Sequence, residues 1–254
     1  MRTFKWMGLA VLVLAAGCGD DPVNPPKQTV APTVLTATGD IAAKVDEFRN
    51  TLGPSNGGVP GDRGTGRREI AWDAAATDPF NNQNDFPPDF FNTTLKVGAV
   101  YTTDGTGLRN DNSLFSEINP TYATEFNVFS PTKIFAPIGS NRLDQLFQVA
   151  GQPTPALVRG FGIVFSDVDV ANQTTIQLFA QDGSSLGTFA APVRSDAAGL
   201  SFVGVSFPDA NIGRVRITLG TGALGANVND ITSGGTADLV VLDNVIYGEP
   251  NAAF

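Results

Sequence analysis

Asp243 stands in the apolar stretch LVVLDNVIY, where an acidic residue has to be explained. Alternation along a strand places five side chains in one row: Leu239, Val241, Asp243, Val245 and Tyr247. An ionised carboxylate in an apolar row costs several kcal/mol unless it is paired or bound to a metal. Ca²⁺ prefers carboxylate and carbonyl oxygens and would satisfy Asp243. The alternatives are a salt bridge to an arginine such as Arg159, or a bulge at which the carboxylate reaches solvent.

Two further carboxylates, Asp167 and Asp169, continue an alternating row that begins with Phe161, Ile163 and Phe165. The change from apolar to acidic predicts that this strand leaves the core at Ser166. Two carboxylates that converge at the rim of a sandwich are candidate ligands for a cation. The alternative is a strand end that closes with solvated carboxylates, because the spacing is unspecific and the sequence contains no EF-hand loop.

Residue types exclude much of catalytic chemistry. The chain has no histidine and one cysteine, so Ser-His-Asp and Cys-His arrangements and His-ligated zinc sites are impossible. A pair of carboxylates, as in glycoside hydrolases, remains conceivable. Four acidic residues are available for it, but the sequence places no two of them together: Glu69, Asp73, Glu117 and Glu125. We therefore expect that the protein is not an enzyme.

Aromatic side chains offer another kind of site, since flat rings with polar edges stack on sugars. The candidates are Trp72, Tyr101, Tyr122 and Tyr247. The 18 phenylalanines are expected mainly in the core. Those of the loop 74–93 should either bury against the sandwich or line a surface groove.

Composition points to an acidic protein rich in turns. The chain carries 25 acidic and 16 basic residues, a net charge of −9, which argues against nucleic acids and anionic membrane surfaces as partners. Only five of the acidic residues are Glu, and there are 28 Gly and 17 Pro. Asp, Gly and Pro favour turns over helices.

Short alternating segments predict the elements that position these residues. Strands are expected at 95–101, 113–118, 132–136, 144–149, 158–168, 174–181, 185–191, 200–207, 213–219 and 238–247. The last is apolar on both faces and should be central, and Asp182-Gly183 marks a hairpin turn. Residues 40–52 carry the only plausible helix, with Ile41, Val45, Phe48 and Leu52 on one face. We expect one domain at 37–254: an all-β, antiparallel sandwich of about ten strands.

The N-terminus reads as a secretory signal. Arg2 and Lys5 precede an apolar run that ends in Leu14-Ala15-Ala16-Gly17-Cys18. This ending resembles the lipobox of bacterial lipoproteins. The resemblance implies that residues 1–17 are a signal peptide, that Cys18 is lipidated, and that 18–36 is a Pro-rich tether. Gly19 after the cysteine is similar to the pattern of lipoproteins exported to the outer membrane.

Three segments in the last hundred residues resemble a jelly-roll module: GFGIVFSDVD (160–169), TTIQLFAQDGSSLGTF (174–189) and ADLVVLDNVIYGE (237–249). Their order is similar to extracellular sandwich domains related to carbohydrate-binding modules. In such modules the Asp of the last strand often ligates a structural calcium, and the matching residue is Asp243.

These observations favour a lipid-anchored protein of the cell envelope with a binding or structural role. The first hypothesis is a glycan-binding module with a structural calcium near Asp243. The second is an envelope or adhesion protein that binds another protein, which predicts an exposed apolar patch in the loop 74–93. A hydrolase with paired carboxylates is the third.

Overall fold

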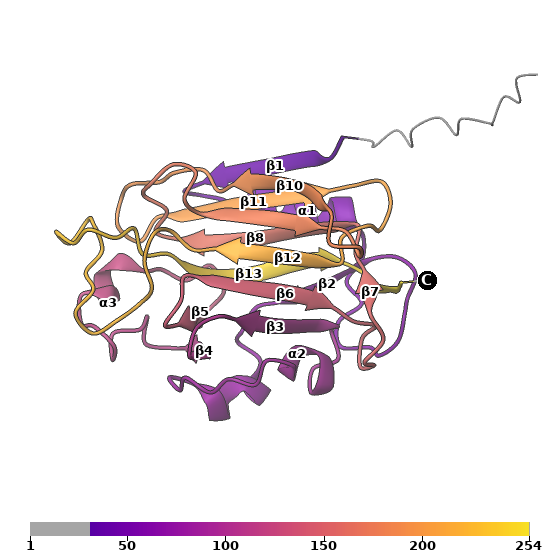
Figure 1. Ribbon diagram of the computed structural model, residues 1–254, viewed down its shortest axis with the longest axis horizontal. Helices are drawn as coiled ribbons and strands as arrows, with labels where there is room; N and C mark the ends of the chain where they lie inside the picture. Colours follow the sequence, from indigo (N-terminus) through magenta and orange to yellow (C-terminus); the bar gives the residue numbers. More distant parts are fainter. Residues whose placement is uncertain (1–30, 254) are drawn as a thin grey trace, which may run out of the picture. The chain divides into compact units, whose positions relative to one another are not determined.

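The computed structural model describes residues 31–253. The signal segment, Cys18 and most of the expected tether lie outside these residues. The remainder is the all-β antiparallel sandwich that the sequence predicted, with two large sheets stacked face to face (Figure 1). Within this part of the chain, no helix is long and apolar enough to cross a membrane.

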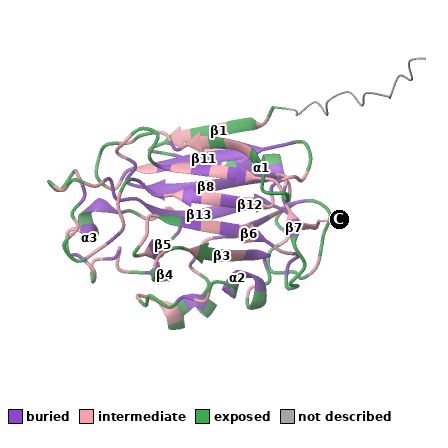
Figure 2. Ribbon diagram, viewed as in Figure 1, coloured by how far each residue is buried: buried purple, intermediate pink, exposed green. Residues whose placement is uncertain are grey.

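The larger sheet has seven strands. In spatial order they are β1 (Thr33–Thr38), β11 (Leu200–Ser206), β8 (Gly160–Ser166), β13 (Val241–Gly248), β5 (Ile134–Ile138) and β4 (Gly107–Asp111), and β2 (Arg67–Ile70) also pairs with β13. The apolar stretch around Asp243 is thus a central strand, as expected. Figure 2 shows buried residues along β11, β8 and β13 and exposed ones on the edge strand β1.

The smaller sheet has five strands, in the order β10 (Ser185–Ala190), β9 (Thr175–Phe179), β12 (Arg214–Thr218), β6 (Arg142–Phe147) and β3 (Ala99–Thr103). A short pair, β7 (Ala156–Leu157) and β14 (Asn251–Ala252), completes the strands. The predicted hairpin joins β9 to β10, and Gly183 takes the left-handed conformation that the turn requires, with φ of 84°.

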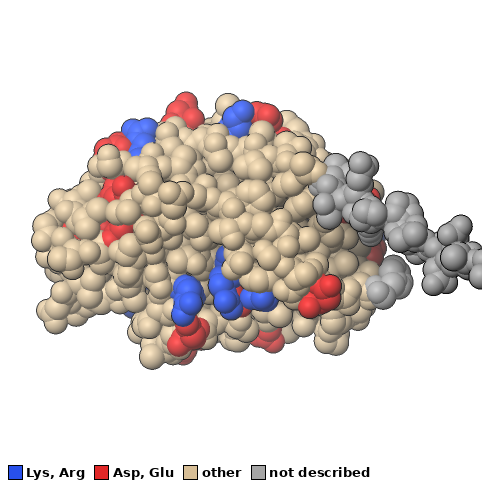
Figure 3. Space-filling model, turned by 45° about the horizontal axis from the view of Figure 1, so that its top comes forward, with Lys and Arg blue, Asp and Glu red and all other residues tan. Residues whose placement is uncertain are grey.

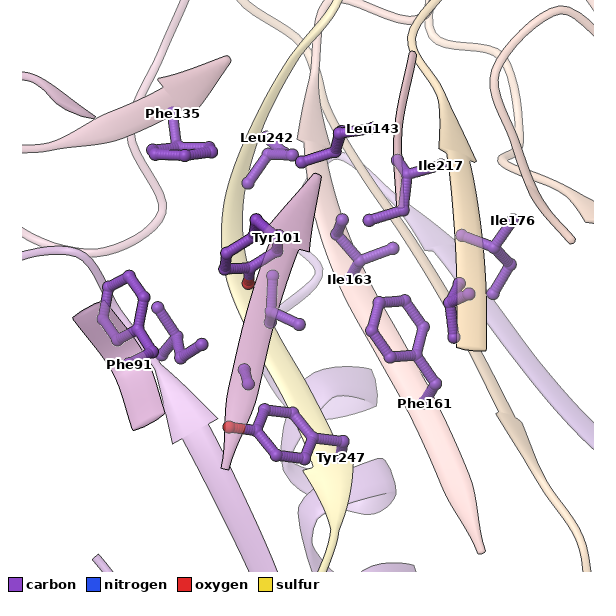
Figure 4. Packing of buried hydrophobic residues seen from close by; sticks show 14 of the residues in the cluster. Phe91, Tyr101, Phe135, Leu143, Phe161, Ile163, Ile176, Ile217, Leu242 and Tyr247 are labelled. Atoms are coloured by element: carbon purple, nitrogen blue, oxygen red, sulfur yellow. The ribbon is translucent and has the colours of Figure 1, made fainter. Parts of the chain in front are cut away.

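The main core lies between the two sheets and contains side chains from both (Figure 4). The labelled residues include Phe161 and Ile163 of β8 and Ile176 and Ile217 of the smaller sheet. Trp72 stacks on Phe135, with ring centroids 4.0 Å apart.

The outer face of the larger sheet is covered by the predicted helix α1 (Ala42–Leu52). Its buried side chains are Val45, Phe48 and Leu52, which confirms the sequence pattern. Phe48 lies over two glycines of adjacent strands. A Cβ at Gly162 or Gly204 would approach the Phe48 ring to 2.6 or 2.7 Å, so only glycine fits beneath it.

Several elements differ from those expected. The structure also contains the 3₁₀ helix η1 (Ala75–Phe80) and two single-turn helices, α2 (Phe90–Thr93) and α3 (Tyr122–Glu125), whereas at most one helix was predicted. Strand β1 begins at Thr33, inside the expected tether.

The predicted strand 113–118 is wrong. Asp111 Oδ1 accepts hydrogen bonds from the backbone N–H groups of Ser113 and Phe115, both at 2.8 Å, and folds the segment into turns. This local bonding competes with a sheet ladder and wins.

Candidate functional site

The predicted acidic pair lies at the rim of the larger sheet, where β8 ends at Ser166. Asp167 takes a left-handed conformation, with φ of 71°, and its N–H donates to the carbonyl of Gly199 at 2.8 Å. This turns the chain away from the sheet. Asp167 and Asp169 meet in one cluster, as the alternating row suggested.

Three more carboxylates join them from distant parts of the sequence. Glu125 comes from the last position of α3, and Asp230 and Asp238 come from the long connection between β12 and β13. The cluster consists of two triads. In the first, carboxylate oxygens of Glu125, Asp167 and Asp230 all lie within 4.8 Å of one another. In the second, the same is true of Asp169, Asp230 and Asp238. We call these five residues the acidic cluster.

Hydrogen bonds from the connection hold the first triad in place. Asp230 Oδ1 accepts from the backbone N–H of Thr232 at 2.8 Å, and its Oδ2 accepts from the N–H of Leu239 at 2.7 Å. The hydroxyls of Thr232 and Ser233 donate to the two oxygens of Glu125. These contacts fix carboxylate orientation without neutralising any charge.

The second triad is tied to the end of β8. Asp238 accepts one hydrogen bond from the N–H of Asp169 and one from the N–H of Val170, each at 3.2 Å. Through these bonds the connection between β12 and β13 docks on the residues that follow β8. The backbone thus brings the carboxylates of Asp169 and Asp238 together.

Asp167 is the most anomalous member of the cluster. Its exposed fraction is 0%, and neither carboxylate oxygen has a hydrogen-bond partner. Both oxygens of the partly exposed Asp169 also lack a partner. Among residues 31–253, no Lys or Arg forms a salt bridge with any of the five carboxylates. Buried polar atoms are almost always satisfied in folded proteins, so these oxygens call for a ligand.

The electrostatics agree with this geometry. Burial, and then the neighbouring Asp169, raise the pKa of Asp167 to about 9. Burial, and then Asp230, raise the pKa of Asp169 to about 7. Burial also raises the pKa of Asp238. Packing like charges together without a cation disfavours their ionised forms, whereas a bound cation reverses this effect.

The donor set selects the kind of ion. All five side chains offer oxygen, which suits hard cations such as Ca²⁺ and Mg²⁺. Ca²⁺–oxygen distances of about 2.3–2.6 Å place two ligands of one ion up to about 5 Å apart. Oxygens within 4.8 Å of one another therefore fit around a single Ca²⁺.

Asp243, the other candidate ligand, lies outside the acidic cluster. One of its oxygens accepts from the N–H groups of Phe129 at 2.5 Å and Ser130 at 3.1 Å, and the other accepts from the Ser130 hydroxyl at 2.7 Å. Burial raises the pKa of Asp243 to about 7, although these hydrogen bonds act to lower it. The expected partner Arg159 donates instead to the carbonyl of Thr51. Asp243 therefore links β13 to the segment before β5.

A β-bulge explains why the row around Asp243 was misjudged. The pairing of β13 with β8 shifts between Leu242 and Val245. Val245 consequently faces the main core together with Leu242, while Val241 faces a second apolar cluster on the other side. The extra residue of a bulge reverses the alternation beyond it.

The aromatic candidates are buried, with exposed fractions of 1% for Trp72 and 0% for Tyr101, Tyr122 and Tyr247. Trp72 Nε1 donates to the carbonyl of Asp243, and Tyr122 Oη donates to that of Val228 at 2.7 Å. The ring faces suggested for sugar stacking are therefore used for packing inside the protein.

The loop 74–93 buries its phenylalanines. Phe86, Phe90 and Phe91 lie in the main core, and Phe80 packs against it. In the described chain, the large apolar side chains that are exposed are Val34, Val59 and Val193, none of which belongs to this loop. The apolar patch expected for protein binding is thus not found there.

The other carboxylates considered for hydrolysis lie apart from the acidic cluster. Glu69 pairs with Arg49, and Glu117 pairs with Arg109 at 3.1 Å. Asp73 accepts from the hydroxyl of Thr132 at 2.6 Å. These three have local partners, and only Glu125 joins other carboxylates.

Sequence reasoning did not single out Asp230 and Asp238. They stand in the segment ANVNDITSGGTAD (226–238), which is rich in turn formers and contains two carboxylates but has no recognised ligand spacing. The signal was its acidic, Gly-rich composition beside the final strand. Nothing local in the sequence links this segment to the end of β8.

Comparisons with known proteins add little to this geometry. No family model and no curated protein matches the chain. A similar solved structure is the enzymatically active domain of tailspike protein 4 of bacteriophage CBA120, at 14% identity and a TM-score of 0.28. The match covers 65% of this chain and 21% of the tailspike chain. The expectation of a non-enzymatic protein is contradicted by this comparison, since that domain is enzymatically active. A TM-score of 0.28 transfers no reaction to this chain.

Proposed function

We propose that this chain is a β-sandwich protein of the cell envelope that binds Ca²⁺ at the acidic cluster. The observation that carries the proposal is Asp167: its two oxygens are fully buried and have no partners, and one of them lies within 4.8 Å of oxygens of Glu125 and Asp230. Burying an unpaired carboxylate is strongly unfavourable, and a divalent cation supplies the missing partner. The ion would fix the connection between β12 and β13 against the end of β8.

Thermal unfolding of the purified full-length chain tests this proposal. Saturating CaCl₂, compared with EDTA, should raise the Tm by about 5–10 °C, the range expected for a ligand at roughly 100 times its Kd and a domain of this size. The Asp167→Asn variant should lose most of this rise. Asp243→Asn is the matched control: it changes another buried carboxylate and should keep the full rise.

Two outcomes would reject calcium binding. One is an identical Tm in CaCl₂ and EDTA for the unsubstituted chain. The other is a rise that persists unchanged in Asp167→Asn. MgCl₂ serves as a selectivity control, because Mg²⁺ demands octahedral geometry with shorter bonds and keeps its water. We expect a smaller rise with Mg²⁺ than with Ca²⁺.

The envelope location rests on the N-terminal sequence. The run Leu14-Ala15-Ala16-Gly17-Cys18 supports lipidation of Cys18 and anchoring of the mature protein in a membrane, with Gly19 favouring the outer membrane. Labelling of bacterial cells with a tagged fatty acid should mark the protein and not its Cys18→Ser variant. Labelling of both, or of neither, would contradict the proposal.

The outer face of the smaller sheet favours a glycan as the binding partner. A hollow of about 140 Å³ there is lined by Thr102, Asp104, Arg142, Asp144 and Arg216, among others. Arg216 donates two hydrogen bonds to Asp144, at 2.8 and 3.0 Å. Such fixed donors and acceptors suit the hydroxyl groups of a saccharide.

A pull-down on a panel of insoluble polysaccharides tests this face. Figure 3 shows basic and acidic side chains next to each other in small groups on the visible face of the molecule. The control is therefore a substitution of a second arginine that also pairs with an aspartate. Arg216→Ala should reduce retention at least tenfold. Arg194→Ala, which breaks a surface pair with Asp196, should leave it unchanged. Equal retention of the two variants would reject this binding face.

A further inference from the structure

The five carboxylates of the acidic cluster are divided into two groups. Glu125 and Asp167 belong only to the first triad, and Asp169 and Asp238 belong only to the second. Asp230 alone belongs to both. Each triad is compact enough for the coordination shell of one ion.

We infer that the acidic cluster holds two Ca²⁺ ions bridged by the carboxylate of Asp230. This inference rests on the proposed calcium binding and specifies its stoichiometry. The first ion is ligated by Glu125, Asp167 and Asp230, and the second by Asp169, Asp230 and Asp238.

The hydrogen bonds of Asp230 suit a bridging role. A carboxylate offers about four lone-pair directions, two on each oxygen. The N–H of Thr232 donates to Oδ1 and the N–H of Leu239 donates to Oδ2, and the single proton of the Thr232 hydroxyl goes to Glu125, so each oxygen of Asp230 keeps a free lone pair. One oxygen can therefore face each ion while the donors on the protein side hold the carboxylate still.

The charges of the cluster also favour a second divalent ion. Five ionised carboxylates carry five negative charges, and no Lys or Arg of residues 31–253 forms a salt bridge with them. One Ca²⁺ would leave three negative charges in a buried site, and two would leave a single one. Unpaired buried charge is the costly quantity, so the second ion removes most of the remaining cost.

Each triad contains a carboxylate whose oxygens have no protein partner, which gives each ion its own evidence. In the first triad it is Asp167, with an exposed fraction of 0%. In the second it is Asp169, whose two oxygens are buried although the residue is partly exposed. The second ion therefore lies nearer to solvent and should exchange faster than the first.

Equilibrium dialysis of the metal-free full-length chain against ⁴⁵CaCl₂ measures the stoichiometry. We expect two ions for each unsubstituted chain. Glu125→Gln removes the charge of a ligand of the first ion only, and Asp238→Asn removes the charge of a ligand of the second only, so each variant should bind one ion tightly and the other at least tenfold more weakly. Asp230→Asn should weaken both sites at least tenfold, and Asp243→Asn should still bind two.

The unsubstituted chain decides the question even if a variant does not fold. Binding of one ion would overturn the two-ion inference and leave calcium binding standing. Binding of no ion would overturn both. Two ions that are lost together in Glu125→Gln and in Asp238→Asn, with the fold retained by circular dichroism, would overturn the assignment of separate triads.

Discussion

Replacing Asp167 with asparagine should have opposite effects on stability with and without calcium. Without the ion, Asp167 is a buried carboxylate with no partner, beside other carboxylates. Asparagine keeps the shape, removes the charge, and supplies an N–H₂ group that can donate to a neighbouring oxygen. It also tolerates the left-handed backbone of this position better than most residues do. The metal-free variant should therefore be more stable than the metal-free parent.

The magnitude follows from the proton that the parent must bind. The ordinary pKa of the carboxyl is 3.8, and pH 7 lies about three units above it. Protonating the carboxyl at this pH therefore costs about 4 kcal/mol. Water that reaches the rim beside Asp169 screens part of this cost, so we expect about 2–4 kcal/mol for the substitution. For a domain of this size, that corresponds to a rise in Tm of about 5–15 °C in EDTA.

The pH dependence has a defined sign. The pKa of Asp167 is raised from its ordinary value of 3.8 to about 9 in the folded chain. At any pH between these two values, folding is therefore accompanied by the uptake of a proton. The free energy of unfolding of the metal-free parent should fall as pH rises through this window. In Asp167→Asn this slope should be smaller.

Differential scanning calorimetry in EDTA and in CaCl₂ at pH 5, 7 and 9 measures both effects. The parent should gain more from CaCl₂ than the variant, because the variant lacks a charged ligand. A lower Tm of Asp167→Asn in EDTA would refute the reasoning, since it would mean that the carboxylate is satisfied without a cation.

Three other predictions concern the scaffold. Gly204→Ala should lower stability by about 1–3 kcal/mol, because its Cβ meets Phe48 at 2.7 Å, and Phe48→Leu in the same chain should recover part of the loss in a thermal melt. Glu249→Gln should cost about 3–5 kcal/mol in urea unfolding, because it removes the negative charge beside the buried Arg68 and replaces one of the two oxygens that accept its 2.6 Å bonds with an NH₂ group; a loss under 1 kcal/mol would contradict this. Trp72, 1% exposed, should show blue-shifted fluorescence that moves to the red in a single transition, and solvent-like emission in the native chain would contradict its burial.

The fold was largely predictable because its main elements have local signatures. The spacing of Val45, Phe48 and Leu52 identified α1, and the apolar stretch around Asp243 identified a central strand. The prediction of a strand at 113–118 was wrong because the apolar residues of this segment are buried while the backbone forms a turn that Asp111 stabilises. A single side chain bonded to nearby backbone can outweigh a strand-like pattern.

The candidate site was only half predictable for a different reason. Asp167 and Asp169 follow directly on a readable strand, so their position at a rim could be inferred. Glu125, Asp230 and Asp238 reach the same place through long connections whose course no local pattern encodes. For Asp243, the alternation of side chains was counted correctly, but the extra residue of the bulge in β13 reverses this alternation, so the predicted row of side chains was wrong.

The chain's single cysteine means that no disulfide can staple the domain internally. The acidic cluster joins α3, the end of β8 and the connection to β13, and so links Glu125 to Asp238 across about half of the domain. A covalent staple over a loop of roughly a hundred residues is worth about 4–5 kcal/mol through the lost entropy of the unfolded chain. Bound ions would do the same work reversibly. The concentration of free calcium, in place of the redox state of the compartment, would then decide whether this closure of the chain is locked or open.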